Sequence, residues 1–118
     1  MNGSNGVKVC IKARSGELEL ALARTLADAF GESVVLICDP NADCRSDIVV
    51  TTDAASSPTE VSDMTDRGEQ VVVLAALPND IAEASYRHAG AREYLPMVAA
   101  VAPLIAAVGA LLTSLAGA

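Results

Sequence analysis

Residues 70–97 read QVVVLAALPNDIAEASYRHAGAREYLPM, and this stretch decides the fold class. It opens with a continuous apolar run, as expected for a strand that is buried on both faces of a parallel sheet. Asn79 can cap a helix over residues 80–88, and Gly90 can end that helix. A second apolar strand follows over residues 94–97. Strand, helix, glycine turn and strand form a parallel βαβ unit, so we predict an α/β domain.

The rest of the chain repeats this alternation. We predict further strands over residues 7–13, 33–38 and 48–52, and further helices over residues 15–31, 58–68 and 100–115. Five strands suit a flavodoxin-like, doubly wound parallel sheet with the strand order 2-1-3-4-5. Too few residues separate the second and third strands for a full crossover helix, so we predict that the second helix is short or missing. We expect one domain over residues 1–118, with a flexible start over residues 1–6.

The composition indicates a folded, acidic protein. Of the 118 residues, 52% are hydrophobic and 3% aromatic, so a single core must be built mainly from Ala, Val and Leu. The formal net charge of −7 disfavours contact with phosphate backbones, and we expect no direct binding of nucleic acid. Three cysteines without a Cys-x-x-Cys spacing, and a polar start without a signal peptide, predict a cytoplasmic protein.

The C-terminal segment is unusual because residues 94–118 contain no charged residue. Pro103 and Gly109 interrupt it and no basic residues flank it, so we expect no membrane span. A helix packed on a sheet normally shows a polar stripe to water, and this one has none. It either buries one Leu/Val seam under an Ala-rich surface, or packs its outer face on a second subunit or a following domain. The candidate interface residues are Val101, Leu104, Ile105, Val108, Leu111, Leu112, Leu115 and Tyr94.

Metal ligands are sparse in the sequence. The polar residues at 39–43 resemble the start of an EF-hand loop, but Cys44 stands where that loop needs Gly and Val50 where it needs Glu. Asp39 and Asp53 both follow strand ends and could form a displaced cation site, although two loop aspartates are more often simply solvated. We therefore expect no cofactor and no metal.

The valine strand of residues 71–76 and the segment Ala89-Gly90-Ala91-Arg92-Glu93-Tyr94-Leu95-Pro96 resemble a known family. They are similar to the fourth and fifth strands of response-regulator receiver (CheY-like) domains, above all those of LuxR/NarL-type transcription regulators. The resemblance implies a fold that transfers a phosphoryl group to an aspartate. In the family, an acidic pair holds Mg²⁺, while a Thr or Ser and a Lys bind the phosphoryl oxygens.

The positions that carry this chemistry have changed in this chain. The acidic pair, the acceptor, the hydroxyl and the lysine fall, in that order, on Ala13, Arg14, Thr52, Ala75 and Met97. Asp53 lies one residue after the acceptor position, where a strand would turn its side chain to the other face. It is a weak substitute for the acceptor. The resemblance thus implies a receiver-like domain that cannot be phosphorylated by the family mechanism, and we expect no enzymatic activity.

Three functional hypotheses follow. The first is a phosphorylation-independent pseudo-receiver that dimerises through the last helix and regulates transcription, with a DNA-binding domain beyond Ala118. The second is a small-molecule sensor that uses the emptied pocket, with Arg14 as the anchor for an anion. The third is an atypical phospho-acceptor at Asp53.

Overall fold

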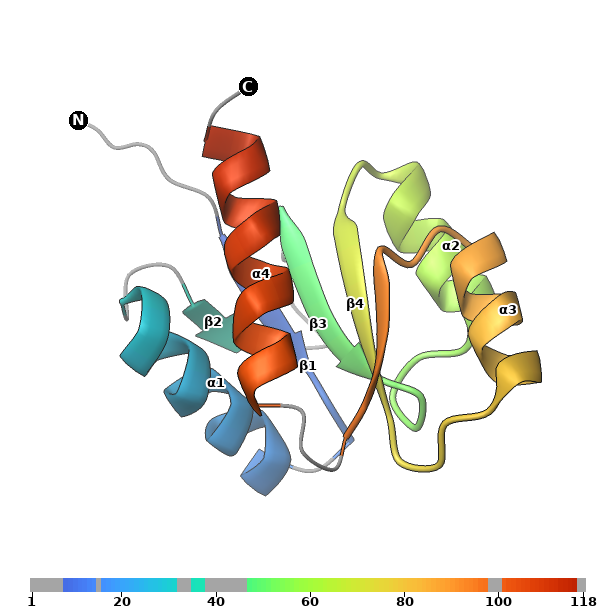
Figure 1. Ribbon diagram of the computed structural model, residues 1–118, viewed down its shortest axis with the longest axis horizontal. Coiled ribbons are helices and arrows are strands. Elements are labelled where there is room, and N and C mark those ends of the chain that lie inside the picture. Colours follow the sequence, from blue (N-terminus) through green and yellow to red (C-terminus); the bar gives the residue numbers. More distant parts are fainter. Residues whose placement is uncertain (1–7, 15, 32–34, 38–46, 98–100, 117–118) are drawn as a thin grey trace.

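Five parallel strands form one sheet in the order β2-β1-β3-β4-β5 (Figure 1). The computed structural model describes residues 8–14, 16–31, 35–37, 47–97 and 101–116. Its elements are β1 (Val9–Lys12), α1 (Gly16–Phe30), β2 (Val35–Ile37), β3 (Ile48–Thr52), α2 (Pro58–Asp66), β4 (Gln70–Ala75), α3 (Asp80–His88), β5 (Glu93–Pro96) and α4 (Val101–Ala116). The predicted α/β class with a parallel sheet is confirmed. The predicted short or missing second helix falls mainly on residues 38–46, outside the described residues.

The helices cover the sheet in two layers. Helices α1 and α4 lie on one face, and α2 and α3 on the other (Figure 1). Alternate residues of the strands point to opposite faces, so β3, β4 and β5 contribute to two separate cores. Under α1 and α4 the buried cluster consists of Val9, Ile11, Leu26, Ile48, Val50, Val72, Leu74, Leu104, Val108 and Leu111. Under α2 and α3 it consists of Val49, Val61, Met64, Val71, Val73, Ala75, Tyr86, Ala91 and Tyr94.

Helix ends follow local sequence signals. The Asn79 side chain accepts a hydrogen bond of 2.8 Å from the Ala82 N–H and caps α3, as predicted. Gly90 lies just beyond the end of α3 with a φ of 112°, a backbone conformation that favours glycine. Helix α2 begins with Pro58 at its first position, where the missing N–H costs no hydrogen bond. These signals fix where α2 begins and where α3 begins and ends.

The orientation of α4 corrects part of the predicted interface. Leu104, Val108 and Leu111 face the sheet and are almost fully buried, so they are core residues and not contacts for a partner. Three other candidates divide between surface and core: Val101 is exposed, Ile105 half-buried, and Leu112 partly buried against the same core. The helix therefore buries one Leu/Val seam and turns small, uncharged residues outward. In the described part of the chain, no helix is long and apolar enough to cross a membrane.

Candidate functional site at the carboxyl edge of the sheet

The carboxyl ends of β1, β3, β4 and β5 meet at one edge of the sheet, because the strands are parallel. The register pairs Lys12 with Thr51, Thr52 with Leu74, and Ala75 with Pro96. The predicted site positions immediately follow or occupy these strand ends, so the fold brings them to the same edge. In open α/β sheets this edge is where ligands bind, so it is the candidate site.

The side chains at this edge do not fit the magnesium ion that the resemblance implies. Ala13 offers no side-chain oxygen, and Arg14 is exposed and cationic at the place where a carboxylate ligand would be needed. Thr52 is buried, and its Oγ1 accepts a hydrogen bond of 3.1 Å from the Ala55 N–H. Within the described ranges, no group of three or more His, Cys, Asp or Glu side chains could hold a metal ion.

The two positions at the ends of β4 and β5 are structural. Ala75 is fully buried and belongs to the core under α2 and α3. Met97 packs against the core on the opposite face, under α1 and α4. The Met97 N–H donates a hydrogen bond of 2.8 Å to the Ala75 carbonyl, which continues the strand pairing past the last residue of β5. Neither residue provides a hydroxyl or ammonium group at the edge.

Asp53 lies in the turn that follows β3. Its backbone N–H donates a hydrogen bond of 3.0 Å to the Leu74 carbonyl, and the residue is half-buried. The strand residues before it alternate between the two cores, with Val49 under α2 and α3 and Val50 under α1 and α4. Thr52 therefore occupies the last strand position, while Asp53 is already part of the loop.

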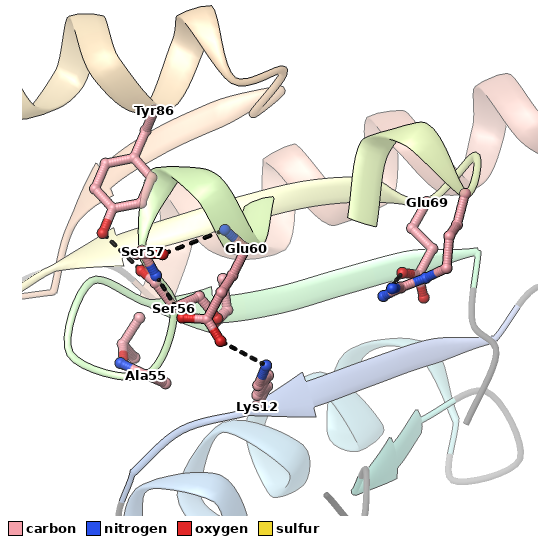
Figure 2. Close-up of polar contacts among 10 residues, drawn as sticks. Lys12, Ala55, Ser56, Ser57, Glu60, Glu69 and Tyr86 are labelled. Carbon is pink, nitrogen blue, oxygen red and sulfur yellow. Dashed lines mark hydrogen bonds and ion pairs between the residues drawn. The ribbon is translucent and has the colours of Figure 1, made fainter. Parts of the chain in front are cut away.

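The sequence predicts a loop between β3 and α2, but not the hydrogen bonds that hold it. We call residues 53–57 the edge loop. Ser56 is buried in it, and its Oγ shares a hydrogen bond of 2.7 Å with Thr51 Oγ1. The Tyr86 hydroxyl donates a hydrogen bond of 2.7 Å to the Ser56 carbonyl and lies 3.4 Å from the Asp53 carbonyl (Figure 2). Burial, followed by the nearby Asp53 charge, raises the pKa of Tyr86, so its hydroxyl remains a proton donor.

The edge loop ends in a capping box at the start of α2. The Glu60 N–H donates to Ser57 Oγ at 3.2 Å, and the Ser57 N–H donates to Glu60 Oε1 at 2.9 Å. Glu60 Oε2 also lies 3.9 Å from Lys12 Nζ, which links α2 to the end of β1 (Figure 2). The S-x-x-E spacing of Ser57 and Glu60 could have predicted this capping box from the sequence. No local pattern could have predicted the ion pair between Lys12 and Glu60.

The same contacts make the cap sensitive to pH. The hydrogen bond from the Ser57 backbone holds the pKa of the Glu60 carboxyl below its usual value; the Lys12 charge acts in the same direction, and partial burial opposes it. Because the pKa is lowered in the folded state, the stabilisation is present above the ordinary pKa of the carboxyl. It is lost as the pH falls through the lowered value.

Tyr94 is a core aromatic and not the interface residue that the sequence suggested. It is 7% exposed, and its ring centroid lies 5.8 Å from that of Tyr86. Its hydroxyl is buried and has no hydrogen-bond partner among the described residues. Ala75 belongs to the same cluster and has no polar side-chain atom to offer. As far as the described residues go, the Tyr94 hydroxyl is thus an unsatisfied donor inside an apolar core.

We expect Tyr94→Phe to leave the fold intact and to raise the free energy of unfolding by about 1 kcal/mol. The substitution removes a buried hydroxyl that forms no hydrogen bond with the described residues, while the ring contact with Tyr86 remains. Urea denaturation of the two proteins measures the change. A loss of stability comparable to a broken hydrogen bond would show that the Tyr94 hydroxyl has a partner in solution.

Comparison with known proteins identifies the fold. No family model matches the chain, and no curated protein matches its sequence. Similar solved structures include an orphan response regulator of H. pylori, with 18% identity over 91% of this chain and 97% of that chain, and a TM-score of 0.74. The signal receiver domain of NarL from Mycobacterium tuberculosis has 13% identity over 93% and 98%, with a TM-score of 0.71. This chain has the receiver fold. A pilus assembly-related protein of Burkholderia pseudomallei is also similar, with 15% identity over 91% and 90%, and a TM-score of 0.74.

The receiver fold confirms the resemblance at the level of architecture. The structural similarity covers almost the whole chain, but the sequence identity to these structures is low. The chemistry of the carboxyl edge must therefore be judged from this chain's own residues. The candidate calcium-loop residues at 39–44 and the possible cation ligand Asp39 lie outside the described residues, as does the side chain of Leu115.

Proposed function

We propose that this domain is a phosphorylation-independent regulatory module with the receiver fold, in a bacterial transcription regulator. The observation that carries the proposal is the composition of the carboxyl edge. Phosphoryl transfer needs positioned cations and hydrogen-bond donors around the transferred group. The edge instead holds the apolar Ala75 and Met97, and the exposed Arg14 where a metal ligand is needed. Similar structures include a pilus assembly-related protein, so the fold is not restricted to response regulators.

We expect beryllium fluoride with Mg²⁺ to leave the NMR spectrum of the domain unchanged. Beryllium fluoride imitates a phosphoryl group on an aspartate only where a carboxylate and a bound cation act together. The edge carries Arg14 and Ala13 in place of the acidic pair. Mg²⁺-dependent shifts around Asp53 would overturn the proposal and establish the alternative, an atypical acceptor at Asp53. An Asp53→Asn variant that abolishes such shifts would identify the acceptor.

The proposal includes association of two copies through the outer face of α4. This face carries the exposed Val101 and a series of small exposed residues, namely Ala102, Ala106 and Ala110. Small side chains allow the backbones of two helices to approach closely, and the segment contains no charge that would have to be desolvated. The area available on one helix is modest, so the expected dimer belongs to the weak class of interfaces.

We expect Ala106→Asp to convert a dimer into a folded monomer. The substitution places two like charges in the centre of the proposed interface, and its side chain points to solvent in the monomer. Sedimentation velocity over a range of concentrations measures the association. Ala84→Asp is the matched control, because Ala84 is an exposed alanine on α3, away from this face. A monomeric unmutated domain at all concentrations would refute the dimer.

A DNA-binding domain beyond Ala118 completes the proposed regulator. The net charge of −7 makes this domain itself a poor ligand for DNA, so contact with operator DNA would have to come from another part of the protein. The reading frame downstream of Ala118 tests this directly, since it either encodes a basic helical domain or does not.

A second candidate function is the recognition of a small anion at the carboxyl edge. Arg14 favours it, because the side chain is exposed two residues beyond the end of β1. Lys12, the last residue of β1, adds a second cation, although it is paired with Glu60 at 3.9 Å. A thermal-shift screen with acidic metabolites tests this candidate. We expect stabilisation that Arg14→Ala removes if the edge binds such a ligand. A flat response in both proteins counts against it.

A further inference from the structure

Tyr86 connects helix α3 to the edge loop by a buried hydrogen bond. The Tyr86 hydroxyl donates to the Ser56 carbonyl at 2.7 Å, and both residues are at least nine-tenths buried (Figure 2). The two residues are far apart in the sequence, so this bond is a tertiary connection and not part of a helix or turn. A hydrogen bond of this kind is costly to break, because the freed groups remain out of contact with water.

Ser56 is tied to β3 as well as to α3. Its N–H donates to the Thr52 carbonyl at 3.0 Å, and its Oγ shares a hydrogen bond of 2.7 Å with Thr51 Oγ1. The next residue, Ser57, caps α2. A single buried serine, directly before the cap of α2, is thus bonded both to the end of β3 and to the last turn of α3.

The neighbouring tyrosine does not provide a second connection of this kind. The Tyr94 hydroxyl has no hydrogen-bond partner among the described residues, and Ala75 beside it in the core has no polar side-chain atom. Among the described residues, the hydrogen bonds that join the edge loop itself to α3 are those of Tyr86, whereas Thr65 Oγ1 joins α2 to the Ala89 carbonyl at the end of α3. Ile81 in the first turn of α3 and Leu77 in the segment that leads into the helix are each 83% exposed, so a shift of α3 would change the placement of a large apolar side chain on the surface.

We propose that the Tyr86–Ser56 hydrogen bond couples the carboxyl edge to α3. When the edge loop is held, Tyr86 keeps α3 in place. When the loop is disturbed, by an occupant of the edge or by a substitution, α3 loosens together with it. This coupling uses neither a phosphorylated aspartate nor the α4 face, so it can be true or false independently of the proposed function.

Hydrogen exchange of the whole 118-residue domain tests the coupling. In Tyr86→Phe we expect the amides of the edge loop and of α3 to exchange roughly fivefold faster, the factor that corresponds to one typical hydrogen bond. Amides that exchange only through global unfolding should accelerate by the same factor, because that opening also breaks the bond. Amides of α1, on the opposite face of the sheet, that exchange through local opening should not change. Tyr94→Phe is the matched control and should not accelerate exchange in either segment. Acceleration in only one of the two segments, or equal acceleration in the locally opening amides of α1, would refute the coupling.

A double-mutant cycle provides the second measurement. Thr51→Val is nearly isosteric and removes the Thr51–Ser56 hydrogen bond from the β3 side, and in the described part of the chain no polar contact joins Thr51 to α3. We expect it to accelerate exchange in the edge loop and also in α3, and the effect on α3 should disappear in the Tyr86→Phe background. If Thr51→Val affects α3 to the same extent in both backgrounds, the signal does not pass through Tyr86 and the proposal is wrong.

Discussion

Val108→Asp is expected to unfold the domain. Val108 is fully buried in the centre of the seam that α4 packs against the sheet, in the same cluster as Leu26 and Leu104. An aspartate there must either remain ionised without water or bind a proton, and either choice costs free energy. A loss of about 4 kcal/mol or more is expected from such a burial, and domains of this size have only about 5–15 kcal/mol in total. Far-UV circular dichroism and a urea titration measure the loss of the cooperative transition.

Ala106→Asp is the control for this experiment because it introduces the same charge on the same helix. Ala106 is exposed, so its change in unfolding free energy should stay within about 0.5 kcal/mol. Comparison of Val108→Asp with Ala106→Asp distinguishes the buried seam of α4 from the outer face proposed for association. If Val108→Asp were folded and only the oligomeric state changed, the seam would lie at an interface and the orientation of α4 would be wrong.

Which face of α4 is buried was the part of the fold that the sequence could least predict. A helix normally reveals its buried face by the contrast between apolar and charged residues. Residues 101–116 contain no charge, and Leu, Ile and Val occur on more than one side. Leu104 and Val101 are therefore indistinguishable by type, although one is buried and the other exposed. Only packing against β4, β5 and α1 decides between them.

Local signals predicted much of the remaining architecture. Asn79 and Gly90 act where the sequence placed them, since a cap and a positive φ depend on one residue and its neighbours. The strand ends also meet as expected, because parallel pairing brings them to one edge. The Tyr86–Ser56 hydrogen bond was missed for the opposite reason. It joins residues thirty positions apart, and nothing near Ser56 distinguishes it from an ordinary loop serine.

Gly90→Ala is expected to cost about 3 kcal/mol or more in unfolding free energy. Two effects add at this position. The φ of 112° is unfavourable for any residue with a Cβ atom, and a Cβ placed on Gly90 would lie 2.8 Å from both Cγ2 and Oγ1 of Thr65. Thr65 cannot simply turn away, because its Oγ1 donates a hydrogen bond of 3.0 Å to the Ala89 carbonyl and so joins α2 to the end of α3. Urea denaturation measures the loss.

Gly68→Ala separates the two effects. Gly68 also has a positive φ, of 91°, but a Cβ there would meet nothing within 4 Å, so only the backbone term of about 1–2 kcal/mol should appear. The difference between the two glycine variants is then the cost of the contact with Thr65. Thr65→Ala removes the two atoms at 2.8 Å and leaves Cβ at 3.0 Å, so it should rescue Gly90→Ala only in part. Equal losses at Gly90 and Gly68 would mean that α2 and α3 are not in contact at this point.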